Sequence, residues 1–207
     1  MTAGGVKAGP GSSAGEITSA GVVKVQKGAS TGAVTEGATV QKVTLPTVNA
    51  NPEGTGGILR KPKDAQAGAL MLMPGRYGKV ESAPKDNLIL VGGDYHFVDL
   101  TVDAFSTITI DLSNGQPLVI RVAEEITFGS GVKMKVTGGD ASDIIIMADG
   151  SKLWLRDDGV YYGTMVAPNG NVIIGQKSEL TGAAWGREVW VMTDSVTKAA
   201  AYRHPVP

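Results

Sequence analysis

The stretch YYGTMVAPNGNVIIGQKSELTGAAWGREVWVM, residues 161–192, decides the fold class. It contains two apolar runs rich in Val and Ile, separated by glycines, which is the pattern of short half-buried β-strands. No amphipathic helical segment lies between the two runs. A tryptophan stands at position 190, where strand alternation predicts a polar, outward residue.

The same pattern recurs along most of the chain. Short strand candidates follow one another without a helix between them, which excludes a doubly wound α/β fold and predicts an all-β protein. The candidates between positions 69 and 199 are residues 80, 88–91, 95–98, 108–112, 118–122, 126–128, 132–136, 144–147, 153–155, 172–174 and 189–191.

Similar residues recur at a nearly constant spacing. Tyr77 and Tyr95 are 18 positions apart, Leu153 and Val172 are 19 apart, and Val172 and Val189 are 17 apart. Such a period is typical of a β-helix, whose coils stack with about 4.8 Å between neighbouring strands. We therefore predict a right-handed β-solenoid of roughly 18 residues per coil.

A β-sandwich is the alternative fold, because hairpins with two-residue turns would also give many short strands. The dipeptides that favour such turns are Asn114-Gly115, Asp149-Gly150, Asp158-Gly159 and Asn169-Gly170.

Composition divides the chain into five parts. Residues 1–19, rich in Gly, Ser and Ala, are predicted to be a flexible lead-in. Residues 20–46 form N-terminal coils or an assembly segment that either caps its own rod or adds to a neighbour's. Residues 47–68 are a loop or linker, residues 69–199 the main solenoid, and residues 200–207 a tail.

Charge and cysteine content exclude several classes of partner. Nineteen Lys and Arg residues balance twenty Asp and Glu residues, so no global positive field would attract nucleic acid. No apolar run is long enough for a membrane span, and residues 1–10 lack the blocks of a signal peptide. The absence of cysteine excludes disulfides and thiolate sites.

Four segments resemble a bacterial surface-domain family. They are LMPGRYGKV (72–80), NLILVGGDYHFVDL (87–100), GQPLVIRVAEEITFGSGVKMKV (115–136) and YYGTMVAPNGNVIIGQKSELTGAAWGREVWV (161–191). The family comprises the β-helical domains of choice-of-anchor A proteins and a related domain of pilus-assembly-associated proteins. The resemblance covers most of residues 15–197 and implies an extracellular or cell-surface, non-enzymatic domain, with Met1 starting a trimmed chain.

The last of these segments is also similar to the end of the bacterial ice-binding β-solenoid family. The chain lacks the amphipathic segment that would form the long helix beside that solenoid. Its one Thr-x-Thr element, at Thr107 and Thr109, is not an array, so we place ice binding below the other functions.

The tryptophans are the candidate binding residues. If the flanking aliphatic residues point inward, Trp154 and Trp190 point outward. Ile173 lies 19 positions after Trp154 and 17 before Trp190, so the three residues form an apolar stripe on successive coils. Exposed contiguous apolar surface marks binding sites, although a loop or the N-terminal coils could also cover this stripe.

Nothing in the sequence predicts a catalytic, cofactor or metal site. His96 and His204 are isolated histidines, and the acidic runs 138–143 and 156–159 lack the spacing of a calcium loop. Glu124 and Glu125 are adjacent, so in a strand they face opposite sides and cannot act together on a glycosidic bond.

We therefore expect an extracellular structural or adhesive module, with self-assembly into a filament or surface layer as one form of it. Its expected partners are other copies of itself or a surface protein or glycan. A carbohydrate-binding module that uses Trp154 and Trp190 is the alternative, and an ice-binding protein or a polysaccharide-acting enzyme ranks lower.

Overall fold

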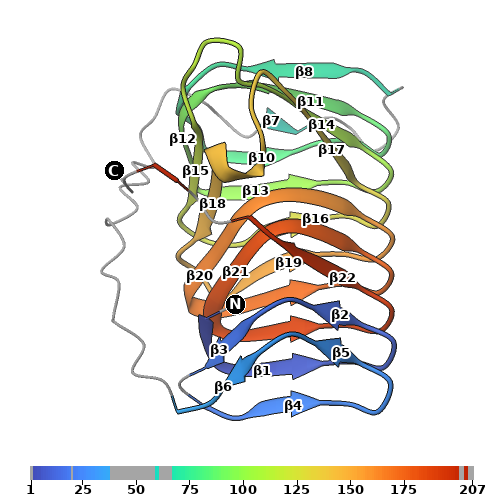
Figure 1. Cartoon of the computed structure of the whole chain (residues 1–207). Helices are drawn as coiled ribbons and strands as arrows, with labels where there is room; N and C mark the ends of the chain where they lie inside the picture. The colour runs from blue at the N-terminus through green and yellow to red at the C-terminus, as the bar shows by residue number, and fades with distance from the viewer. Residues whose placement is uncertain (1, 20, 38–58, 61–66, 201–202, 205–207) are drawn as a thin grey trace.

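The computed structural model describes residues 2–19, 21–37, 59–60, 67–200 and 203–204, and among these residues the chain winds into a rod of stacked coils (Figure 1). Every strand pairing in this part of the chain is parallel. Parallel ladders between successive turns confirm the predicted β-solenoid and exclude a hairpin-built sandwich. The Asn-Gly and Asp-Gly dipeptides form corners, not hairpins.

Each full coil contributes one strand segment to each of three faces, which we call A, B and C. Face A contains, in stacking order, β7 (Leu59–Arg60), β10 (Lys79–Glu81), β13 (Asp99–Val102), β16 (Ile126–Phe128), β19 (Lys152–Leu155), the ends of β20 (Val160–Ile174) and β21 (Glu179–Val191), β1 (Thr2–Ala8) and β4 (Val23–Val25).

Faces B and C follow the same order. Face B contains β8 (Ala69–Leu72), β11 (Asn87–Val91), β14 (Thr107–Asp111), β17 (Lys133–Thr137), the starts of β20 and β21, β22 (Val196–Ala199), β2 (Ser13–Ala14) and β5 (Ser30–Thr31). Face C contains β9 (Gly75–Arg76), β12 (Gly93–Phe97), β15 (Leu118–Val122), β18 (Ile144–Ala148), the middles of β20 and β21, the start of β1, β3 (Ile17–Ser19) and β6 (Val34–Thr35).

Coil length varies along the rod. Leu153 pairs with Val172 and Val172 with Val189, which gives coils of 19 and 17 residues at the predicted positions. Two central coils are longer, because Leu100 pairs with Ile126 and Ile126 with Leu153, 26 and 27 positions apart. The extra residues form loops between faces B and C, one of which carries the 3-10 helix η1 (Ala141–Asp143).

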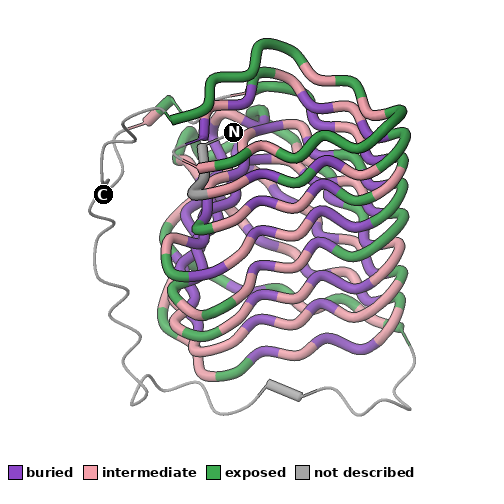
Figure 2. The backbone as a smooth tube through the Cα atoms, turned by 90° about the horizontal axis from the view of Figure 1, so that it is seen from below, coloured by how far each residue is buried: buried purple, intermediate pink, exposed green. Residues whose placement is uncertain are grey.

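The interior is filled by the inward residues of all three faces. Figure 2 shows buried positions alternating with partly exposed ones along successive coils. Tyr95 and Phe97 are fully buried, and their ring centroids lie 6.2 Å apart. The Tyr77 ring stacks on both of them, with its centroid 5.3 Å from Phe97 and 6.5 Å from Tyr95. The residue opposite Tyr95 in the strand ladder is Gly75. A second pair, Phe128 and Tyr161, stacks at 6.0 Å.

A recurrent corner joins face A to face B. One residue with positive φ stands at the same place in each turn, and the positions are Gly11, Gly28, Lys85, Phe105, Gly131, Asp158, Lys177 and Asp194. Most coils follow it with a small buried residue. The hydroxyl of Ser178 donates to the Arg156 carbonyl at 2.8 Å, and that of Ser195 donates to the Gly175 carbonyl at 2.6 Å. These bonds satisfy backbone oxygens that the turn removes from the ladder.

The N-terminal residues differ from the predicted flexible lead-in. Residues 2–19 form β1, β2 and β3, and β1 pairs with β21 from Thr2 opposite Trp185 to Ala8 opposite Val191. Val6 and Ile17 from these strands are part of the buried core. The prediction was wrong because the Gly and Ser residues that suggested flexibility are corner residues: Ser12 is buried, and its hydroxyl donates to the Gly9 carbonyl at 2.6 Å.

The next segment forms a further coil on the same rod. Strands β4, β5 and β6 pair with β1, β2 and β3, so residues 21–37 stack on the end of their own solenoid. Residues 38–46 and most of the predicted linker 47–68 lie outside the described residues, apart from β7 and residues 67–68. Strands β8 to β22 occupy the region predicted as the main solenoid.

Candidate functional site

The predicted binding residues lie on face A. Trp154 of β19 pairs with Ile173 of β20, and Ile173 pairs with Trp190 of β21. All three side chains are partly exposed, which places them on the outward side of the sheet. The structure therefore brings the three residues together as neighbours on three consecutive strands, and we call them the tryptophan stripe. Trp154 and Trp190 are two strand spacings, or roughly 10 Å, apart.

Cationic side chains contact both tryptophan rings. The Arg156 guanidinium carbon lies 4.1 Å from the centre of the Trp154 ring, and the Lys152 ammonium lies 5.4 Å from it. The Lys7 ammonium lies 4.5 Å from the Trp190 ring. Cations at these distances interact favourably with the π face of an indole. The stripe is thus an aromatic surface bordered by positive charge.

Trp190 is also fixed by a hydrogen bond. Its indole N–H donates to Glu188 at 2.7 Å, and Lys7 forms an ion pair with the same carboxylate at 3.6 Å. The indole hydrogen bond, and then the neighbouring Lys7, hold the pKa of Glu188 below its usual range. We call Lys7, Glu188 and Trp190 the triad. Because Lys7 belongs to β1, the triad also links β1 to β21.

The stripe extends in both directions along the rod. Thr127 of β16 lies opposite Trp154, and Thr101 of β13 lies opposite Thr127. On the other side, Lys7 lies opposite Trp190, and Lys24 of β4 lies opposite Lys7. Face A thus presents a row parallel to the rod axis that passes from threonine to aromatic and aliphatic residues and then to lysine.

A second feature is a groove on face B. Strands β17 and β20 pair only at Lys133 and Val160 among the described residues, and then diverge. Beyond that point the Tyr162 amide donates to the Met134 sulfur at 3.3 Å, instead of to a backbone carbonyl. The divergence opens a groove of about 720 Å³, lined by both strands, by η1 and by Ala200.

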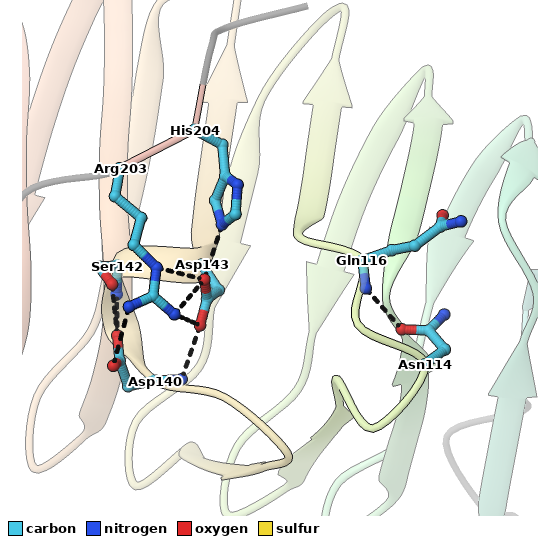
Figure 3. Close-up of polar contacts among 7 residues, drawn as sticks. All are labelled: Asn114, Gln116, Asp140, Ser142, Asp143, Arg203 and His204. Atoms are coloured by element: carbon cyan, nitrogen blue, oxygen red, sulfur yellow. Dashed lines mark hydrogen bonds and ion pairs between the residues drawn. The ribbon is translucent and has the colours of Figure 1, made fainter.

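The segment after β22 is docked beside this groove. Figure 3 shows Arg203 and His204 pointing toward Asp143 at the end of η1. The Arg203 guanidinium donates to both Asp143 oxygens, at 2.8 and 2.7 Å, and His204 Nε2 lies 2.7 Å from one of them. Burial alone would raise the pKa of Asp143, but hydrogen bonds from His204, the Asp140 amide and Arg203 outweigh it and lower the pKa. We call these contacts the C-terminal clamp.

The loop between β14 and β15, in the preceding coil, is also held by side-chain hydrogen bonds. Asn114 accepts from the Gln116 amide at 3.1 Å (Figure 3) and donates to the Gly92 carbonyl at 2.8 Å. Both loops are closed by these contacts on the side of the rod. The contacts could not be predicted from sequence, because each partner is distant along the chain or part of the backbone.

Face C carries an apolar cluster that sequence reasoning missed. Val119, Ile145, Met147 and Val166 occupy outward positions yet are buried, and Trp185 packs against them. The signal was the loss of alternation: β15 and β18 read LVIRV and IIIMA and are buried at every position. Strands buried on both sides have near-continuous apolar runs.

The remaining polar residues form structural contacts. His96 lies outward on β12, 3.4 Å from Asp94, which also pairs with Arg121. No group of three or more metal-ligating side chains occurs in the part of the chain that the structure describes. Within that same part, no helix has the length and apolar character needed to cross a membrane.

Comparison with known proteins identifies the fold. No family model matches the chain, and no curated protein matches it. Among solved structures, the chain is similar to the DUF3494 domain of ice-binding protein_1 from Shewanella frigidimarina, with a TM-score of 0.59 and 13% sequence identity. The alignment covers 96% of this chain and 92% of that one. At this identity the likeness establishes a shared β-solenoid fold.

Proposed function

We propose that the chain is an extracellular adhesive module that binds a surface carbohydrate polymer along face A. The tryptophan stripe carries this proposal: Trp154, Ile173 and Trp190 are consecutive neighbours, partly exposed, on a sheet whose strands fix their spacing. Indole rings stack on the apolar faces of sugar rings, and a row along the rod suits a chain molecule better than a compact ligand.

The charges around the stripe indicate the kind of polymer. Lys7, Lys152 and Arg156 border the indole rings, and Lys24 continues the row. Two of these cations already have an acidic partner, since Lys7 pairs with Glu188 at 3.6 Å and Lys152 pairs with Glu125 at 3.0 Å. Arg156 and Lys24 are therefore the cations best placed to meet an anionic group. A polymer that combines flat sugar rings with carboxylate or sulfate groups fits this surface, with the anions on the cationic border.

The test is a binding assay with acidic and neutral polysaccharides on one array. We expect the wild-type protein to bind acidic members in a salt-sensitive manner. Replacing Trp154→Ala and Trp190→Ala together should weaken binding at least about tenfold, since two stacking contacts of roughly 1 kcal/mol each are lost. Phe105→Ala is the matched control, because this aromatic side chain is 65% exposed at a corner away from the stripe.

Two results would contradict the proposal. One is wild-type protein that binds no polysaccharide on the array. The other is a double tryptophan variant that remains folded and binds as tightly as the Phe105→Ala control.

Ice binding is the second candidate function, favoured by the shared fold with an ice-binding domain. Thr101 and Thr127 are neighbours on face A, but Thr107 and Thr109 lie on face B opposite Lys133 and Lys135, so the threonines form no extended array. Thermal hysteresis of the purified protein distinguishes the two functions. A hysteresis that disappears in the double tryptophan variant would assign face A to ice instead of carbohydrate.

A further inference from the structure

We propose that the N-terminal coils, residues 2–35, can be exchanged between copies of this chain, so that rods join end to end into a filament. The partner is a second copy, and the interaction surface is the edge formed by β21 and β22. This inference does not depend on the ligand of face A. It follows from the order in which the strands stack.

In the single rod, the order in which the strands stack differs from their order along the chain. The chain passes from face A to B to C in each coil, and β22 on face B is the last strand before residue 200. The next place on face C is filled by the start of β1, where Thr2 lies opposite Trp185 of β21. Strands β2 and β3 then continue on faces B and C. The N-terminal coils therefore continue the winding where the C-terminal strands stop.

The described strands on either side of the connection, β6 and β7, lie at opposite ends of the rod. After β6, residues 36–58 lead to β7, which pairs with β10 at the opposite end. Eight strand spacings separate β4 from β7 on face A, or roughly 38 Å at about 4.8 Å each. The chain from Thr35 to Leu59 can reach roughly 80 Å when extended, so its length permits this crossing.

Exchange removes the need for the crossing. If the N-terminal coils of one copy stack on β21 and β22 of a second copy placed on the same axis, β4, β5 and β6 come to lie directly before β7, β8 and β9 of their own chain. Those strands belong to faces A, B and C in the same order, and Val23 and Leu59 occupy the same position on face A. The chain then winds continuously through the joint.

The contacts made in the exchanged state are those of the single rod. Val6 and Ala8 would fill the same core positions opposite Val189 and Val191 of the neighbour. Domain swapping of this kind needs no new interface, and a head-to-tail arrangement that does not close produces a filament. The exposed end also favours a neighbour, because Val25 and Val34 of the last coil remain 43% and 42% exposed.

Engineered disulfides test the exchange, since the chain contains no cysteine. Gly5 of β1 and Glu188 of β21 are paired outward positions on face A, within the Cα separation that a disulfide requires. Full-length Gly5→Cys and Glu188→Cys single variants are unfolded together, refolded over a range of protein concentrations, and oxidised. A Thr101→Cys and Thr127→Cys pair in the body of the rod, also paired on face A, is the matched control.

Exchange predicts disulfide-linked dimers between the Gly5→Cys and Glu188→Cys chains, increasing with protein concentration, and none between the two control chains. Sedimentation of wild-type protein refolded at high concentration should show a series of multiples of the monomer. Absence of a mixed disulfide at every concentration would overturn the proposal, and rods that associate without it would show end stacking without exchange.

A shortened connection gives a second, independent test. Deleting residues 40–55 leaves a chain between Thr35 and Leu59 that spans at most roughly 28 Å, less than the length of the rod. The variant can place its N-terminal coils only on a neighbour, so it should be oligomeric at concentrations where wild type is monomeric. A shortened variant that is monomeric and whose residues 2–19 are protected from hydrogen exchange would contradict the exchange.

Discussion

The N-terminal coils and the central coils use the same corners but different interiors. Residues 2–35 make coils of 17 residues with small core side chains such as Ala8 and Ala14. The central coils reach 26 and 27 residues, and the 20-residue coil before them contains the stacked rings of Tyr95 and Phe97. A solenoid corner needs only one residue with positive φ and a small neighbour, so a Gly- and Ser-rich segment can continue a rod without adding much core of its own.

The two regions wind in the same way but are not equally stabilised. The corner positions Gly11 and Gly28 repeat those of Lys177 and Asp194, so both regions wind alike. The buried hydrophobic residues of the N-terminal coils are Val6, Ala8, Ala14 and Ile17, none of them aromatic and two of them alanine. Since burial of apolar area supplies most of the folding free energy, these coils have little of their own to stabilise them. The N-terminal coils therefore depend on the edge of β21 for their order, and this dependence is what exchange between copies would use.

The largest effect is expected at the aromatic stack of β12. Phe97→Ala removes a fully buried ring from a three-ring stack and should lower the free energy of unfolding by about 3–5 kcal/mol in chemical denaturation. Ile17→Ala, also fully buried, should cost about 2–4 kcal/mol, but mainly by freeing the N-terminal coils.

Hydrogen exchange separates these two variants. Ile17→Ala should speed exchange in residues 2–35 and leave residues 99–174 unchanged, whereas Phe97→Ala should speed exchange in β12 and in its neighbours β9 and β15. Thr18→Ala, at the neighbouring outward position of β3, is the control for the N-terminal variant. Equal acceleration throughout the chain by Ile17→Ala would show that the two regions unfold as one unit.

A corner substitution tests whether both regions wind by the same rule. Gly11→Ala forces a β-carbon onto a residue with φ of 67° and should cost about 1–2 kcal/mol, measured by thermal or chemical unfolding. Gly15→Ala is the control, since no atom lies within 4 Å of the added carbon. Equal stability of the two variants would contradict the corner argument.

A smaller effect is expected where the two regions meet on the surface. Lys7→Gln removes the cation over Trp190 and its ion pair with Glu188, and should cost about 0.5–1 kcal/mol in chemical denaturation. Lys24→Gln, at the next position of the same row, serves as the control and should change stability by less than about 0.5 kcal/mol. If both substitutions cost the same, the triad does not tie the regions together.

The smallest effect on the rod concerns the C-terminal clamp. The pKa of Asp143 is lowered in the folded protein, so the clamp's contribution to stability is complete above the ordinary carboxyl pKa of 3.8 and is lost as pH falls through the folded value. NMR signals of the Arg203 guanidinium should stay constant between pH 7 and about 5 and change below roughly pH 3.8. Asp143→Asn should show the released signals at every pH.

The alternation of residues was enough to predict the solenoid and the alignment of Trp154, Ile173 and Trp190. These features depend on local periodicity and on coil length, and the coils between positions 153 and 189 have no insertions. The 18-residue spacing of Tyr77 and Tyr95 does not join equivalent positions, because Tyr95 lies opposite Gly75 and the distance between equivalent residues changes once a corner gains residues.

Three features lay beyond sequence reasoning. The order of residues 2–19 depends on an edge supplied by β21, more than 170 positions away, and composition alone suggested flexibility. The clamp joins Asp143 to Arg203 across 60 positions. The buried outward cluster at Ile145 and Met147 was visible as lost alternation, but only knowledge of the faces shows that both sides of the strand are covered.

Native-state hydrogen exchange of residues 2–8 shows whether the N-terminal strand continues the C-terminal coils. If it does, the amides of β1 exchange as slowly as those of its partner β21, far below the rate of an unstructured peptide. Exchange of residues 2–8 at the unstructured rate, with β11 to β21 still protected, would contradict this continuation.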